Sequence, residues 1–177
     1  MTAPTPILTA PHEVRRLVID VGHPYEEFKQ RYEQAVPAVD AERLTALTQA
    51  GADWEQVVAE AKADAPCGFF IYWSQDVTQL MALAGNRWRC VEYLMGDHTT
   101  AERMFRHDPT VMLYAPLRTA IFTAGDDRAR FAIDQPSTRF SSFDNPAIAE
   151  IGRELDGRLA TLLEALAAPV PDTLRNA

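Results

Sequence analysis

The residues with the clearest chemical potential are concentrated in one stretch, GDHTTAERMFRHDP, from Gly96 to Pro109. It contains two histidines, two aspartates, a glutamate and two arginines. These groups can ligate a metal, transfer protons or bind an anion. They are also the residue types that begin and end a short helix. The stretch is therefore consistent with a functional site or with a well-capped helix.

Two binding chemistries are open to this stretch. A metal site fits poorly, because the two histidines are nine residues apart and do not share a helix face as an i, i+4 pair does. An anion fits better, because a turn at Gly96 and Asp97 between a strand and a helix would expose backbone N–H groups. His98, Arg118 or Arg130 could add positive charge, although Asp97 would oppose a phosphate.

Helix signals explain most of the same residues more simply. Thr99, followed by Glu102 at the third position after it, predicts a capping box. His107 would lie in the last turn, where positive charge suits the helix dipole. Pro109 disfavours helix at the residue before it. No metal is expected, and only the Gly96–His98 turn remains in need of a functional explanation.

Further candidate residues lie outside the stretch. Glu92 is a charge in an otherwise apolar strand, so it could be a buried general base or could lie on a wet face or a sheet edge. Tyr114, Arg118, Arg130 and Asp134 belong to one predicted hairpin. Its two guanidiniums could hold a carboxylate ligand between them, or pair with acids across the strands. Glycine-rich phosphate loops and a GxSxG elbow are absent from the sequence.

The bulk composition excludes several classes of protein. The 177 residues fit one domain with a sizeable core, and the net charge of -8 argues against a nucleic-acid surface. No apolar run approaches the roughly 18 residues of a membrane helix, and the start does not resemble a signal peptide. Cys67 and Cys90 form no CxxC pattern, so free thiols are expected before a disulfide. A cytoplasmic chain without a cofactor is predicted.

Hydrophobic periodicity predicts the elements of the first third of the chain. Residues 14–21 alternate as a strand, and Pro24 opens a helix that runs to about residue 36. The Ala-rich segment of about 38–66 fits two helices, one capped by Asp40 and one by a capping box at Asp53. This segment is interpreted as a helical insertion. The aromatic face of the preceding helix would consist of Tyr25, Phe28 and Tyr32.

Strands dominate the middle of the chain. The run GFFIYW at 68–73 predicts a buried strand, and SQDVTQLMALAGN an amphipathic helix with Val77, Leu80, Met81 and Ala84 on one face. Residues 88–95 return to strand. Residues 110–122 predict a long strand interrupted at Pro116, paired in a hairpin with ARFAID. Four aromatic residues would enter the core or line an apolar pocket: Tyr72, Trp73, Trp88 and Tyr93.

The last part of the chain predicts a loop, QPSTRFSSFDNP, and then a long helix. Asn145 and Pro146 form the N-cap and first position of that helix. Gly152 and Gly157 within it indicate close packing against the sheet. The apolar stripe of the helix comprises Ile148, Ile151, Leu155, Leu159, Leu162 and Leu166.

These elements predict an α+β fold in a single domain over residues 12–168. An antiparallel sheet of about five strands would pack on the long C-terminal helix, with the helical insertion after the first helix. Residues 1–11 are expected to be a disordered lead-in, and residues 169–177 a frayed tail.

Three short motifs resemble those of the domain-of-unknown-function family 302. The first is the turn Gly96-Asp97-His98, after a strand. The second is Ala115-Pro116-Leu117-Arg118, similar to an L-P-L-R strand. The third is Ile133-Asp134-Gln135-Pro136-Ser137, similar to a Y-D-D-P-S end of the following strand. The resemblance covers roughly residues 69–163.

The resemblance implies a fold of the TATA-binding-protein-like type: a strand, a helix, an antiparallel sheet and a long C-terminal helix. The chain departs from the family pattern in two places. Asp97 and His98 stand where the family turn often has Asn and then Pro, and the helices between Pro37 and Pro66 resemble an addition. The resemblance implies no activity.

Three functions are consistent with these observations. The first is a small-molecule-binding domain, expected as a homodimer, with a pocket between sheet and helices and polar anchors at the Gly96–His98 turn and the Arg118 hairpin. The second is a cofactor-independent enzyme in which Asp97 or Glu92 is the base, His98 the acid/base partner and Arg118 the oxyanion or carboxylate holder. The third is a protein-interaction module, which an exposed apolar patch on the folded protein would support.

Overall fold

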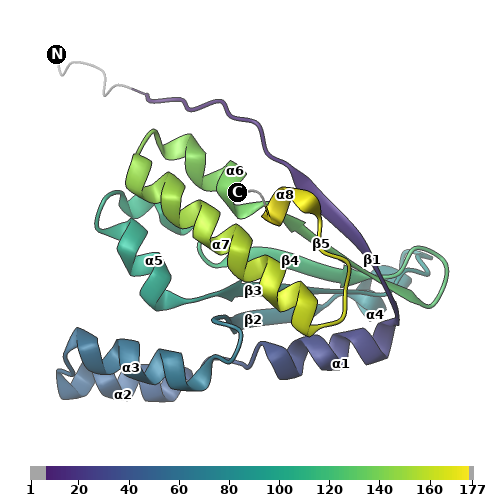
Figure 1. Cartoon of the computed structure of the whole chain (residues 1–177). Coiled ribbons are helices and arrows are strands. Elements are labelled where there is room, and N and C mark those ends of the chain that lie inside the picture. Colours follow the sequence, from purple (N-terminus) through teal and green to yellow (C-terminus); the bar gives the residue numbers. More distant parts are fainter. Residues whose placement is uncertain (1–6, 176–177) are drawn as a thin grey trace, which may run out of the picture.

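The structure, a computed structural model, describes residues 7–175 and consists of one sheet with helices around it (Figure 1). The strands are β1 Arg16–Pro24, β2 Phe70–Asp76, β3 Cys90–Gly96, β4 Leu117–Phe122 and β5 Arg128–Asp134. The helices are α1 Tyr25–Ala35, α2 Ala41–Ala50, α3 Trp54–Asp64, α4 Thr78–Ala82, α5 His98–Phe105, α6 Pro136–Phe140, α7 Pro146–Ala165 and α8 Asp172–Arg175. Two 3-10 turns, η1 Pro109–Leu113 and η2 Ser141–Phe143, complete the described chain.

The predicted α+β fold class is confirmed. The five strands form an open sheet in the order β1-β5-β4-β3-β2, and every neighbouring pair is antiparallel. The β4–β5 hairpin pairs as expected, and α7 is the predicted long C-terminal helix. Asn145 caps α7 by accepting hydrogen bonds from the backbone N–H groups of Ala147 and Ile148. None of the described helices is long and apolar enough to span a bilayer.

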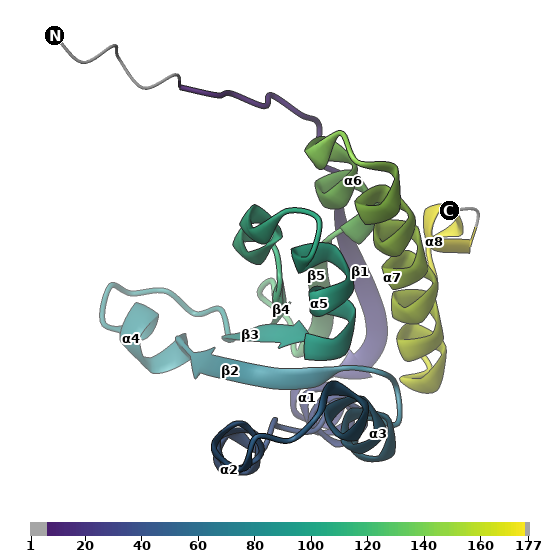
Figure 2. The same ribbon diagram turned by 90° about the vertical axis from the view of Figure 1, so that its left-hand side faces the viewer.

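The core lies on one face of the sheet. Alternate strand residues point to this face, and α1 and α7 supply the helical side of the same apolar cluster. Figure 2 shows α7 standing along this side of the sheet. The predicted aromatic face of α1 and the predicted stripe of α7 are both buried. The opposite face, called the open face below, leaves Arg16, Val18 and Arg118 exposed.

The helical insertion forms the predicted pair of helices. Asp40 caps α2 by accepting from the backbone N–H of Arg43, and Asp53 and Gln56 form the expected capping box at the start of α3. Ala61 is the one buried residue of the two helices. Figure 1 shows both helices at one end of the molecule, away from α7. Local caps therefore account for these helices better than core packing does.

The predicted amphipathic helix after β2 is wrong in extent. The strand continues to Asp76, and α4 has only five residues. The predicted apolar face does not reach the core, because Leu80 and Met81 are exposed. Trp73 and Trp88 are exposed as well, whereas Tyr93 is fully buried. Figure 2 shows α4 projecting beyond the sheet, where none of the other described helices covers it.

Three predictions about the segments around the β4–β5 hairpin and α7 are also wrong. Residues 110–116 are not strand: η1 and a cis peptide bond at Ala115–Pro116 precede β4. The predicted loop at QPSTRFSSFDNP contains α6 and η2. Gly152 does not pack on the sheet, because an added Cβ would lie 2.9 Å from Phe140 Cβ, in α6. Proline and helix-capping residues make such short turns, which strand periodicity does not reveal.

The tail predicted to be frayed is folded as far as Arg175. It forms α8, and Leu174 is buried against the core. Asp156, fully buried in α7, accepts hydrogen bonds from Gln135 Nε2 and from the backbone and hydroxyl of Ser137. Gln135 also donates to the carbonyl of Thr173, which ties the tail to α7. Residues 1–6 of the predicted disordered lead-in lie outside the described residues. Residues 7–11 have exposed side chains and form neither helix nor strand.

Candidate functional site

A cavity of about 320 Å³ lies where β3 and β4 meet α5, α6 and α7, and is called the helix-side cavity below. It begins at the turn between β3 and α5 that the sequence singled out. Its polar lining consists of Tyr72, Asp97, His98, Thr100 and Glu102. Its apolar lining consists of Gly96, Ala101, Met104, Phe105, Met112, Ala115, Pro116, Leu117, Phe140 and Leu155.

Gly96 lies in close packing at one wall of this cavity. A Cβ at residue 96 would lie 3.3 Å from both Cα and Cβ of Pro116 and 3.7 Å from the ring of Tyr72. The contact to Pro116 Cα is with backbone, which cannot turn away as a side chain can. Glycine therefore allows the β3 end to approach the Ala115–Pro116 segment. Two of the three family motifs meet at this contact.

Asp97 is the N-cap of α5, and the predicted capping box at Thr99 is wrong. The Asp97 carboxylate accepts from the backbone N–H of Thr99 at 2.9 Å and of Thr100 at 3.2 Å, and from both hydroxyls. Glu102 pairs with Arg106 instead of reaching back to the cap. The helix begins two residues earlier than expected because Asp97, two positions before Thr99, caps at least as well as a threonine.

Arg158 completes the environment of Asp97. Its guanidinium, from α7, lies 3.2 Å from Asp97 Oδ2 and donates to the hydroxyl of Thr100 at 2.8 Å. Burial alone would raise the pKa of Asp97, but the hydrogen bonds from Thr100, Thr99 and Arg158 together lower it below its ordinary value. A carboxylate that is stabilised in this way is a weak base at neutral pH.

Tyr72 contacts both the backbone and the ring of His98. The Tyr72 hydroxyl accepts a hydrogen bond from the backbone N–H of His98 at 3.0 Å and lies 2.8 Å from His98 Nδ1. Burial raises the pKa of Tyr72 to about 12, so the hydroxyl keeps its single proton at neutral pH. Nδ1 accepts this proton when the neutral His98 ring carries its own proton on Nε2.

His98 Nε2 is buried and has no hydrogen-bond partner among the described residues. Burial lowers the pKa of His98, and the charge of Asp97 opposes this effect only partly. The ring stacks against Phe70 at a centroid distance of 5.9 Å, which holds its plane. The site thus presents an oriented ring nitrogen, Nε2, whose lost solvation no described residue compensates.

A second cavity, of about 330 Å³, lies on the open face beside the first and is called the open-face cavity below. Met112, Pro116 and Leu117 line both cavities and so form a shared wall. The other residues of the open-face cavity are Leu94, Leu113, Tyr114, Arg118, Asp134 and Arg139. Arg139 forms an ion pair with Asp134 and lies over the ring of Tyr114, 4.9 Å from its centroid.

The sequence-predicted site residues are distributed over both cavities and beyond them. Glu92 lies on the open face and pairs with Arg118 at 2.5 Å. Arg130 pairs with Asp126 in the β4–β5 turn and lines neither cavity. The proposed base, acid and oxyanion groups of the enzymatic alternative are therefore not assembled at one place. Among the described residues, no group of three or more His, Cys, Asp or Glu could hold a metal.

Sequence reasoning did not assign a role to Tyr72 in the chemistry of His98, or to Arg139. Tyr72 was expected only in the core or in a pocket wall. Its pairing with residue 98 depends on the register between β2 and β3, where Phe70 faces Gly96. Arg139 lies in a segment that was predicted to be a loop. Its position at the cavity depends on the helix α6, which the sequence did not predict. Cys67 and Cys90 are free and partly buried.

The family profile of "Domain of unknown function DUF302" matches residues 45–166, which is more than half of the chain. The chain belongs to this family. The match to DUF302 begins within α2 and therefore includes α3, which the sequence motifs alone suggested to be an addition. It leaves out β1 and α1. No curated protein matches this DUF302 chain.

A solved structure supports the fold of the DUF302 chain. The crystal structure of an uncharacterized conserved protein DUF302 from Bacillus stearothermophilus is similar, with a TM-score of 0.60 and 18% sequence identity. The similarity covers 85% of this chain and 97% of that chain. At this identity the likeness concerns the fold alone. The relation to TATA-binding-protein-like folds stays a prediction.

Proposed function

We propose that this DUF302 chain binds a small, mainly apolar organic molecule in the helix-side cavity, with one hydrogen-bond acceptor of the ligand on His98. The observation that supports this best is the buried Nε2 of His98, which has no partner among the described residues and carries the ring proton when Tyr72 donates to Nδ1. A buried donor without a partner costs about 1–3 kcal/mol, and a ligand acceptor removes that cost.

The walls of the cavity favour a neutral ligand. Nine of the residues named above as its lining carry apolar side chains, and the polar ones include the carboxylates of Asp97 and Glu102. An anionic ligand would meet these carboxylates and a neutral imidazole. A cavity of about 320 Å³ is at the lower end of the sizes that hold small ligands, roughly 300–1,000 Å³. A ketone, aldehyde, ester or ether with an apolar body fits this chemistry.

The experiment compares two ligands of nearly the same shape. Acetophenone has a carbonyl acceptor, and ethylbenzene lacks one. Affinities of the wild type for both are measured by titration in two-dimensional NMR. We expect acetophenone to bind about fivefold more tightly, the factor that corresponds to one hydrogen bond of about 1 kcal/mol. Equal affinities would contradict the role of His98.

Variants separate the donor from the shape of the cavity. His98→Phe keeps a ring against Phe70 and removes the N–H group, so it should bind both ligands alike. Tyr72→Phe removes the hydroxyl that selects the tautomer, so it should reduce the preference for acetophenone without abolishing it. His23→Phe, at a histidine that lines neither cavity, is the matched control and should retain the preference. A preference that persists in His98→Phe would overturn the proposal.

A further inference from the structure

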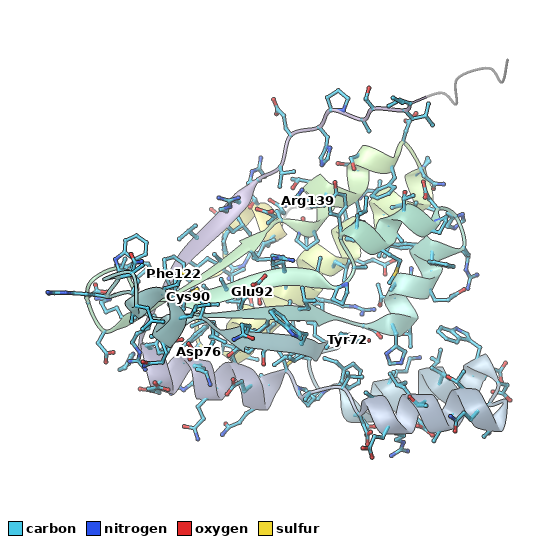
Figure 3. All side chains as sticks on the ribbon, turned by 180° about the vertical axis from the view of Figure 1, so that it is seen from behind. Tyr72, Asp76, Cys90, Glu92, Phe122 and Arg139 are labelled. Atoms are coloured by element: carbon cyan, nitrogen blue, oxygen red, sulfur yellow. The ribbon has the colours of Figure 1, made fainter. Side chains whose placement is uncertain are left out.

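The open-face cavity has a chemistry that the helix-side cavity lacks. Two guanidiniums, of Arg118 and Arg139, line it together with a single carboxylate, that of Asp134. Figure 3 looks onto the open face and shows Glu92 and Arg139 on it. Two neighbours outside the lining add one charge of each sign: Glu92 contacts Arg118, and Arg16 contacts Asp134. The three arginines and two carboxylates leave one net positive charge here, although the chain as a whole carries a net charge of -8. A positive site on an acidic protein selects for an anion at this place.

Arg118 has N–H donors that are not used by another described residue. Its side chain is 75% exposed and contacts Glu92 through Nη1. Glu92 is the single partner of Arg118 among the described residues. A guanidinium carries five N–H donors in a planar fork, so the donors on Nη2 and Nε stay available to a ligand. A carboxylate with two oxygens matches such a fork.

Arg139 is held in place, in contrast to Arg118. Its ion pair with Asp134 and its contact with the Tyr114 ring fix the guanidinium from two sides. The same carboxylate of Asp134 also contacts Arg16, from β1, at 3.4 Å. Asp134 is therefore shared between two arginines and neutralises neither of them alone. A second anion near Arg139 would restore the balance of charge.

The remaining walls are apolar and partly open to solvent. Leu94 and Met112 line the cavity together with Leu113, which is 77% exposed. A bare ion would leave these side chains in water, whereas a ligand with an apolar body would cover them. We propose that the open-face cavity binds a small organic acid, with its carboxylate on Arg118 and Arg139 and its apolar part on Leu94, Met112 and Leu113.

The test uses benzoate and benzyl alcohol, which share a ring and differ in charge. Benzoate is titrated into the wild type, and backbone amide signals are followed by NMR. We expect saturable shifts at residues 94, 113 and 118, with at least tenfold weaker binding of benzyl alcohol. Arg118→Gln should weaken benzoate about tenfold or more, which corresponds to the loss of one charge-assisted hydrogen bond of about 1.5–3 kcal/mol.

Arg128→Gln is the matched control. Arg128 is also an exposed strand arginine of the open face, and it pairs with one carboxylate, that of Asp20, through Nη2. Its substitution should leave benzoate binding unchanged. Equal losses in Arg118→Gln and Arg128→Gln would mean that net charge alone attracts the anion, and would overturn the site. Absence of saturation in the wild type would overturn it as well.

Two further outcomes keep this site separate from the proposed function. Sodium sulfate at the same ionic strength should shift residue 118 weakly or not at all, because it cannot cover the apolar wall. If sulfate bound as tightly as benzoate, the site would be a simple anion site. That result would contradict the proposed contact of the ligand with the apolar wall. Benzoate shifts at residues 98 and 101 in place of 94 and 118 would assign it to the helix-side cavity, and would also contradict the proposal.

Discussion

The two cavities are nearly equal in volume, about 320 and 330 Å³, and lie on either side of one wall. Their polar groups are opposite in kind. The helix-side cavity offers the ring of His98, which we propose to be a neutral N–H donor, and its carboxylates are those of Asp97 and Glu102. The open-face cavity offers two guanidiniums around Asp134. The volume and the position of a cavity therefore do not indicate its ligand. The hydrogen-bond donors in its lining determine which class of ligand it can bind.

The difference follows from the face of the sheet on which each cavity lies. On the covered face, α5 and α7 bury the turn at Asp97, so its charge needs Arg158 and the helix N–H groups as partners. On the open face, water solvates Arg118, and an arginine can stay half-paired there at little cost. Burial thus selects a neutral donor on one side and permits charge on the other.

The largest expected effect on stability comes from a substitution in the wall that the two cavities share. Leu117→Ala removes a buried side chain that lines both cavities, and should lower the free energy of unfolding by about 2–5 kcal/mol. Both cavities should lose ligand affinity together. Urea denaturation gives the stability. Leu113→Ala, at a mostly exposed position of η1, is the control and should change stability by less than about 0.5 kcal/mol. Loss of one binding activity alone would show that the wall is not shared.

An intermediate effect is expected at the cap of α5, and it depends on pH. Asp97→Ala should lower the free energy of unfolding by about 1–2 kcal/mol at pH 7. The folded state lowers the pKa of Asp97, so its contribution is present above the ordinary value of 3.8 and is lost as the pH falls below that value. The difference between variant and wild type should therefore shrink in acid.

Urea denaturation at pH 7 and at pH 3 measures this difference. Asp126→Ala, which removes an exposed pair with Arg130 away from both cavities, is the control and should have a small effect at both pH values. A stability difference that grows in acid would contradict the environment assigned to Asp97.

The smallest effect on stability is expected at Arg139. Arg139→Gln loses a partly exposed ion pair and a cation–π contact, which together contribute about 1 kcal/mol or less. Benzoate binding should nevertheless fall severalfold, while acetophenone binding stays unchanged. Isothermal titration calorimetry with both ligands checks this. A parallel loss of both would mean that the two cavities are not independent.

Much of the fold could be predicted from the sequence because periodicity and caps are local signals. The stripe of α7, the strands around Tyr93 and Phe131, and the caps at Asp40 and Asp53 all follow from neighbours in the chain. The errors lie where tertiary contacts override such signals. The apolar residues of α4 predicted a packed helix, but the β2–β3 hairpin carries them beyond the sheet.

The candidate site could be predicted only in part. The turn at Gly96, Asp97 and His98 was visible as a cluster of polar residues after a strand. The division of roles within it was not, because it depends on groups distant in the chain: Pro116 against Gly96, Arg158 against Asp97, and Tyr72 against His98. Strand register and the crossing of α5 with α7 bring these pairs together, and no local pattern encodes either.

The protonation of His98 tests the central claim most directly. A ¹H–¹⁵N correlation spectrum of the imidazole groups at pH 7, with and without acetophenone, reports which ring nitrogen carries the proton. We predict a neutral ring with the proton on Nε2 and a bare Nδ1, and a shift of the Nε2–H signal on addition of acetophenone but not of benzoate. A proton on Nδ1, a charged ring, or an Nε2–H signal that acetophenone leaves unchanged would contradict the account.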